Sequence, residues 1–184
     1  MNKCFGCGCD GAVTNGFAIK DDLRVVALYG RSQSGKTPTL ALTLVKLITL
    51  CGFEIEKCVS RKFDLAKLIE DSGQYKFSNR SCVLRKQVGE TVKRIGFTTV
   101  GDNVEELKKA FSLFGNCDLY VCAMHEKTKT EKFVDSITKR GKSYKYSRFA
   151  YFESGAQTVD IDQEKRILND LQSSYLASKI SVII

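Results

Sequence analysis

The sequence predicts an α/β fold in which helices cover both faces of a mostly parallel β-sheet. Residues 23–29, LRVVALY, form a nearly continuous apolar run, as expected for a central strand covered on both sides. Strand-like and helix-like segments then alternate along the chain, which is typical of parallel strands joined by right-handed crossovers. The 184 residues and 43% hydrophobic content suit one packed core. We therefore expect residues 23–184 to form a single domain.

The elements of the first half follow from their periodicity. Residues 37–51 are apolar on almost every side and predict a buried helix, which Gly52 is well placed to end. Residues 53–59 alternate as a strand, and residues 63–70 indicate a short helix. The region 81–100 holds two strand-like segments around a Gly-Glu pair, so we expect a β-hairpin insertion there.

A capped helix begins the second half. Asn103 is followed three residues later by Glu106, which is the spacing of a capping box, and apolar residues then repeat at helical spacing. Residues 118–124 form another apolar strand, and residues 131–139 predict a helix.

The end of the chain predicts a strand, a helix and a last strand. Residues 149–152 are strand-like, and residues 160–178 predict a helix whose start Asp160 and Gln163 would cap. The residues 180–184 then favour a strand. On the helix, four apolar residues share one side, which we expect to be its packed face: Ile167, Leu168, Leu171 and Tyr175.

A glycine-containing loop lies between the first strand and the long helix, and each of its residues is a candidate for binding phosphate: Gly30, Arg31, Ser32, Gln33, Ser34, Gly35, Lys36 and Thr37. Glycine tolerates the turns and the close approach that let consecutive backbone N–H groups surround a phosphate. The helix that follows adds its positive dipole end. Lys36 is expected to reach the β- and γ-phosphates, and the Thr37 hydroxyl to ligate Mg²⁺.

This loop is a full Walker A motif, and with it the chain resembles the P-loop NTPase superfamily. The resemblance is specific at the loop and architectural elsewhere. It implies a three-layer P-loop NTPase fold that binds a nucleoside triphosphate with Mg²⁺. ATP is favoured over GTP, because the segment 128–131, TKTE, departs from the guanine-recognition motif of GTPases and no switch motif follows a strand.

A second Mg²⁺ contact is expected from an acid at the carboxyl end of a neighbouring strand. Asp102 follows a strand-like segment and precedes the capped helix, so it is favoured for this role over simple helix capping. Glu153 is the runner-up, and Asp118 is excluded because it opens its strand at the opposite edge. His125 ends that strand and could orient water or contact phosphate, with a surface or hydrogen-bonded structural role as the alternative. The predicted catalytic residues are therefore Lys36, Asp102 and His125.

Three functions are compatible with these features. The first is Mg²⁺-dependent ATP hydrolysis, or an ATP-controlled interaction with a protein partner. The second is a phosphotransferase resembling nucleoside or nucleotide kinases, with residues 139–148 as a basic lid. A nucleic-acid contact, or a solvated loop and strand edge, are the alternatives for this stretch. The third is a non-enzymatic module that binds nucleotide or nucleic acid, a partner class compatible with the net charge of +8.

The opening residues 1–22 show no helix or strand period and predict a flexible head. Cys4, Cys7 and Cys9 resemble half of a zinc site, but no companion pair of ligands at suitable spacing follows. No stretch is apolar enough to span a bilayer, and the start lacks the apolar run of a secretory leader. We therefore expect a cytoplasmic protein with reduced cysteines, while the sequence leaves its oligomeric state open.

Overall fold

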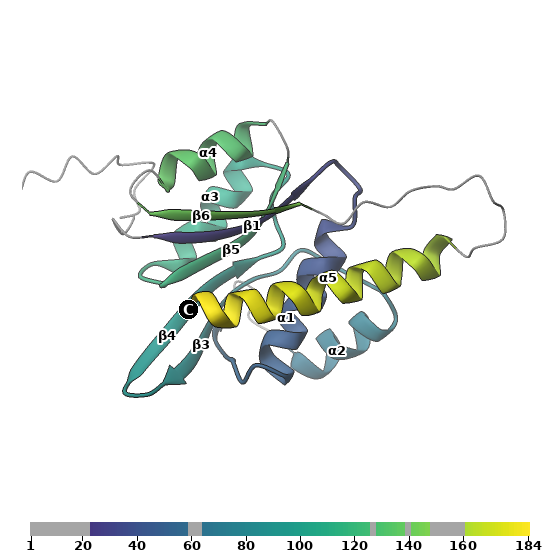
Figure 1. Cartoon of the computed structure of the whole chain (residues 1–184), viewed down its shortest axis with the longest axis horizontal. Helices are drawn as coiled ribbons and strands as arrows, with labels where there is room; N and C mark the ends of the chain where they lie inside the picture. Colours follow the sequence, from purple (N-terminus) through teal and green to yellow (C-terminus); the bar gives the residue numbers. More distant parts are fainter. Residues whose placement is uncertain (1–22, 59–63, 126–127, 139–140, 148–160) are drawn as a thin grey trace, which may run out of the picture.

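A computed structural model of the chain describes residues 23–58, 64–125, 128–138, 141–147 and 161–184. Within these residues, six strands form one mixed sheet in the order β2-β3-β4-β5-β1-β6 (Figure 1). The α/β class predicted from the sequence is therefore confirmed. The predicted head, with Cys4, Cys7 and Cys9, lies outside the described residues.

Four neighbouring strands of the sheet run parallel. They are β4 (Thr91–Thr98), β5 (Leu119–His125), β1 (Arg24–Gly30) and β6 (Lys142–Ser147). Strand β3 (Ser81–Val88) pairs antiparallel with β4 to make the predicted hairpin, and β2 (Glu54–Cys58) pairs antiparallel with β3. Because β1 lies inside the sheet, Val25 to Leu28 are fully buried, as the continuous apolar run predicts.

Helices cover both faces of the sheet and create two apolar cores (Figure 1). On one face lie α1 (Lys36–Thr49), α2 (Leu65–Gly73) and α5 (Ile161–Ile183). The other face carries α3 (Val104–Phe114) and α4 (Lys129–Ile137), where several aromatic rings pack together. Among the described helices, none combines the length and apolarity that crossing a membrane requires.

The carboxyl-terminal helix differs from the prediction in two ways. The strand expected at 180–184 is wrong, because α5 continues to Ile183 and buries Ile180 in the core. The apolar side expected to pack is also wrong, since Ile167 and Leu171 are 51% and 55% exposed. The buried face is polar around Asn169 and Gln172, which have hydrogen-bond partners on α1 and at the end of β6, and it becomes apolar toward the carboxyl-terminal end of the helix.

The basic stretch near residue 140 contributes the edge strand β6, whose register pairs it with β1 along its length. The described part of this stretch, residues 142–147, is thus held in the sheet, which matches the strand-edge alternative rather than a lid. The strand expected at 149–152 lies outside the described residues.

Gly96 sets the spacing between β4 and α3. A Cβ added there would lie 2.2 Å from the ring of Phe114, so only glycine leaves room for this aromatic side chain. We predict that Gly96→Ala lowers the free energy of unfolding by about 1–3 kcal/mol, because overpacking displaces the buried ring.

The matched control is Gly73→Ala, because Gly73 lies in α2 with nothing within 4 Å of the added Cβ. That change should leave stability equal or raise it by up to about 1 kcal/mol. Urea denaturation measures both variants, and equal midpoints would contradict the packing described for Gly96.

Candidate anion-binding site

Residues 30–37, called here the glycine loop, connect the end of β1 to the start of α1. Gly35 precedes α1 in a left-handed conformation with φ 87°, and Gln33 is also left-handed with φ 57°. Alternation of left- and right-handed residues turns successive N–H groups toward one side of the backbone. The first backbone hydrogen bond into α1 is donated by Thr39 to Gly35, at 3.1 Å. The N–H groups before it therefore lie ahead of the helical ladder, where anions bind.

Lys36 lies inside this loop rather than on the surface. Its side chain is buried, and Nζ donates hydrogen bonds to the carbonyl oxygens of Gly30 at 3.1 Å and Arg31 at 2.7 Å. Burial lowers the pKa of the Lys36 ammonium, and the negative charge of Asp102 acts in the opposite direction. An anion bound in the loop would stabilise this partly desolvated ammonium by a charge-assisted hydrogen bond.

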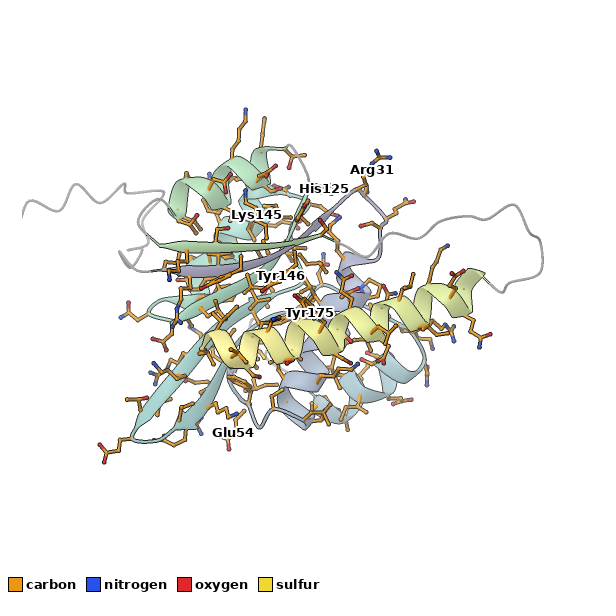
Figure 2. All side chains as sticks on the ribbon, in the orientation of Figure 1. Arg31, Glu54, His125, Lys145, Tyr146 and Tyr175 are labelled. Carbon is orange, nitrogen blue, oxygen red and sulfur yellow. The ribbon has the colours of Figure 1, made fainter. Side chains whose placement is uncertain are left out.

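Ser34 provides a second observation that points to a ligand. Its Oγ is buried and finds no hydrogen-bond partner in the part of the chain that the structure describes. A buried hydroxyl without a partner costs about 1–3 kcal/mol, so an acceptor oxygen entering the loop would relieve this cost. Thr37 is partly buried in the first turn of α1, while Arg31, Ser32 and Gln33 are exposed at the outer side of the loop. Figure 2 shows the Arg31 side chain extending away from the fold.

Asp102 reaches the site from the neighbouring end of β4. Its Oδ1 lies 2.8 Å from Nε2 of His125, and its side chain is 71% exposed. The capping alternative for Asp102 is not needed, because Asn103 is the N-cap of α3 and accepts the N–H of Glu105 at 2.9 Å. Asp102 is thus available to bind a ligand.

Gly101 explains how Asp102 comes so close to β5. A Cβ at Gly101 would lie 2.0 Å from the carbonyl oxygen of Ala123, so the loop after β4 rests directly on the β5 backbone. This close approach places the Asp102 carboxylate beside the last residue of β5.

His125 is that last residue, and the parallel register sets it opposite Gly30, where the glycine loop begins. Its backbone is held by two threonines: the N–H donates to Thr130 Oγ1 at 3.2 Å, and Thr128 Oγ1 donates to the carbonyl oxygen at 3.0 Å. Figure 2 shows His125 and Arg31 at the same end of the molecule. The structure therefore brings an ammonium, a carboxylate and an imidazole to one edge of the sheet.

The other predicted acids do not join this group. Asp118 precedes β5 at the opposite edge, where Oδ2 accepts the N–H of Arg94 at 2.9 Å. Glu153 lies outside the described residues. Sequence reasoning missed Gly101, Thr128 and Thr130 as residues that shape the site. A glycine directly before Asp102 and a Thr-x-Thr pair after a strand were the available indications.

A buried polar contact fixes α1 just below the glycine loop. Thr39 Oγ1 contacts the carbonyl oxygen of Gly35 at 2.9 Å and Oδ1 of Asn169 at 3.1 Å, and Asn169 Nδ2 donates to the Tyr75 hydroxyl. Helix α5 thereby connects α1 with the end of α2. Sequence reasoning also missed Asn169, because it assigned an apolar packed face to α5.

Comparisons of the chain with protein-family models, with curated proteins and with solved structures found no match.

Two fully buried threonines on α1 offer a matched pair for the contact with Asn169. We predict that Thr39→Val lowers the free energy of unfolding by about 1–3 kcal/mol, because a methyl group would replace a fully buried hydroxyl that lies within hydrogen-bond distance of both the Gly35 carbonyl oxygen and Asn169 Oδ1. Thr43→Val should lower the free energy of unfolding by less than about 1 kcal/mol, since within the described residues the Thr43 hydroxyl bonds only to the helix carbonyl of Thr39.

Chemical denaturation of both variants measures the difference. If Thr43→Val proves as destabilising as Thr39→Val, the contact of Thr39 with Asn169 makes no additional contribution to the free energy of unfolding.

Proposed function

We propose that this chain is a P-loop NTPase that binds ATP in the glycine loop. The observation that carries the proposal is the buried Lys36 ammonium, which lies between the Gly30 and Arg31 carbonyl oxygens at the amino-terminal end of α1. The left-handed Gly35 supports it, and so does the buried Ser34 hydroxyl, which has no hydrogen-bond partner among the described residues. In this function, backbone N–H groups of the loop bind the β-phosphate, and Lys36 neutralises the β- and γ-phosphate oxygens.

Mg²⁺ is the cofactor that this site would require. The hydroxyl of Thr37 and the carboxylate of Asp102 are oxygen ligands of the kind that Mg²⁺ prefers, and both belong to segments at the same edge of the sheet. The ion would neutralise charge on the β- and γ-phosphates. Asp102 has two carboxylate oxygens, so one can face the metal while the other stays with His125.

ATP hydrolysis, or an ATP-controlled interaction with a protein partner, is the activity that this arrangement favours. His125 lies next to the start of the loop and contacts Asp102, so its imidazole is placed to hold the carboxylate and to orient a water molecule. Lys36 stabilises negative charge on the phosphates without transferring a proton. These roles assign electrostatic stabilisation to Lys36 and positioning to Asp102 and His125.

ATP is preferred over GTP in this proposal. Within the segment nearest to a guanine-recognition motif, Thr128 and Thr130 hold the backbone of His125. Glu131 Oε1 lies 3.1 Å from Nζ of Lys145, so this acid already neutralises a cation of β6. These contacts use the side chains that a guanine base would need.

One experiment distinguishes ATP hydrolysis from the two other functions, a phosphotransferase and a non-enzymatic binding module. Incubation with γ-labelled ATP and Mg²⁺, alone or with nucleosides and nucleotides, distinguishes released phosphate from label transferred to a second substrate. Neither product is expected of a non-enzymatic module.

Nucleic-acid binding would weaken steeply with added salt. Several described cations are already paired with acids, which disfavours an extended basic surface: Arg85 with Glu54, Arg94 with Glu56 and Lys145 with Asp135.

Lys36→Ala tests the phosphate-binding role. We predict that ATP affinity falls at least about 100-fold, because a side-chain cation contacting two phosphate oxygens contributes several kcal/mol. Equilibrium binding of a fluorescent ATP analogue measures the loss. Lys46→Ala is the matched control, since Lys46 lies on the same helix but pairs with Asp170 at 2.6 Å. Unchanged affinity in Lys36→Ala would remove the basis of the proposal.

Asp102→Asn tests the metal role. We predict a drop of at least about tenfold in Mg²⁺-dependent phosphate release with the fold intact, because an amide oxygen carries no charge to attract the metal. Asp118→Asn, at the opposite edge of the sheet, should retain the full rate. Equal turnover in the two variants would move the metal role to Glu153 or to another acid.

A further inference from the structure

Cys58 and Cys82 face each other across two antiparallel strands. Cys58 is the last residue of β2 and pairs in register with Cys82 of β3. Directly opposed residues of such strands have Cα atoms roughly 4.5–5.5 Å apart, which lies within the roughly 4.4–6.8 Å that a disulfide spans. Both side chains also belong to the same apolar cluster, so they point to one face of the sheet. The two sulfur atoms can therefore meet without a rearrangement of the backbone.

The surroundings make the two thiols unequal. A hydrogen bond with Cys82 lowers the pKa of Cys58, and the Arg80 guanidinium lowers it further against the effect of burial. The same hydrogen bond, together with burial, raises the pKa of Cys82. Cys58 is only half-buried, whereas Cys82 is 3% exposed. Cys58 thus has the properties of an attacking thiolate, and Cys82 those of a protected second thiol.

We propose that Cys58 and Cys82 form a peroxide-sensitive dithiol that converts reversibly into an intramolecular disulfide. This inference does not depend on nucleotide binding. The Cys58 thiolate attacks hydrogen peroxide, the O–O bond breaks, and Cys58 becomes a sulfenic acid while the departing hydroxide takes up a proton. The Cys82 sulfur then attacks the Cys58 sulfur, the S–O bond breaks, and the Cys82 proton leaves with the hydroxide as water. One peroxide is reduced to two waters, and a small dithiol such as dithiothreitol reverses the reaction.

None of the other described cysteines combines a lowered thiol pKa with a cysteine directly opposite on a neighbouring strand. Burial raises the pKa of Cys122 to about 12, and the thiol of Cys117 is buried and donates to the carbonyl oxygen of Phe114 at 2.9 Å. Cys51 is half-buried after α1, at the other end of β2 from Cys58. It therefore serves as the control for simple accessibility.

Peptide mapping of the peroxide-treated protein tests the proposal. The experiment uses a full-length variant in which serine replaces Cys4, Cys7 and Cys9. This variant is treated with equimolar hydrogen peroxide and is then alkylated. The expected product is a peptide pair that joins Cys58 to Cys82 and is lighter than the two thiol peptides by two hydrogen atoms. Dithiothreitol should restore alkylation of both. If both thiols are still alkylated after peroxide, or if Cys58 joins Cys51 instead, the proposal is overturned.

Cys58→Ala separates the two roles. Because Cys58 lies at the edge of the sheet and is half-buried, this variant is expected to fold, and Cys82 should then remain a free thiol after peroxide treatment. Cys51→Ala should leave formation of the Cys58–Cys82 disulfide unchanged. Oxidation of Cys82 in Cys58→Ala at the original rate would show that Cys58 is not the attacking thiol.

Discussion

Burial of the Lys36 ammonium is the constraint on which the candidate site depends. A charged group removed from water needs polar partners, and here the carbonyl oxygens of Gly30 and Arg31 provide them. These oxygens are available because the chain turns sharply between β1 and α1, and the left-handed Gly35 permits that turn. The fold thus holds a partly desolvated cation, together with N–H groups at a helix start, at a position where an anion would stabilise both.

The parallel strands bring the other polar groups to the same edge. Strands β4, β5 and β1 run in one direction, so the residues that follow them converge beyond their carboxyl ends. Gly101 lets the loop after β4 touch the backbone of β5, which sets Asp102 beside His125. The Thr39–Asn169 contact fixes α1 from below. Proposed metal binding, phosphate binding and water orientation therefore draw on separate segments that the sheet aligns.

The sequence predicted the parts of the fold that depend on local pattern. The apolar β1, the glycine loop, the hairpin and the Asn103 cap all have local periodicity or turn residues, and the structure contains each of them. The sequence also predicted the helix α5, but not which side of it packs: Asn169 and Gln172 are buried with hydrogen-bond partners on α1 and β6, while Ile167 and Leu171 face outward. Hydrogen bonds between α5 and other elements depend on the tertiary structure, so the spacing of apolar residues along the helix does not predict them. The contact between Asp102 and His125 could likewise not be predicted from the sequence, because it depends on how closely Gly101 approaches β5.

Titration of the ¹⁵N-labelled protein with ATP and Mg²⁺, followed by amide NMR, shows whether the glycine loop binds the nucleotide. If the loop binds ATP, the largest and saturable shifts occur in the backbone amides of Ser34, Gly35, Lys36 and Thr37, because these groups would contact the phosphates. Amides at the amino-terminal edge of the sheet, such as Leu119, should remain nearly unchanged. Saturable shifts confined to other segments, or no shifts in the glycine loop at millimolar ATP, would show that the loop is not the ATP site.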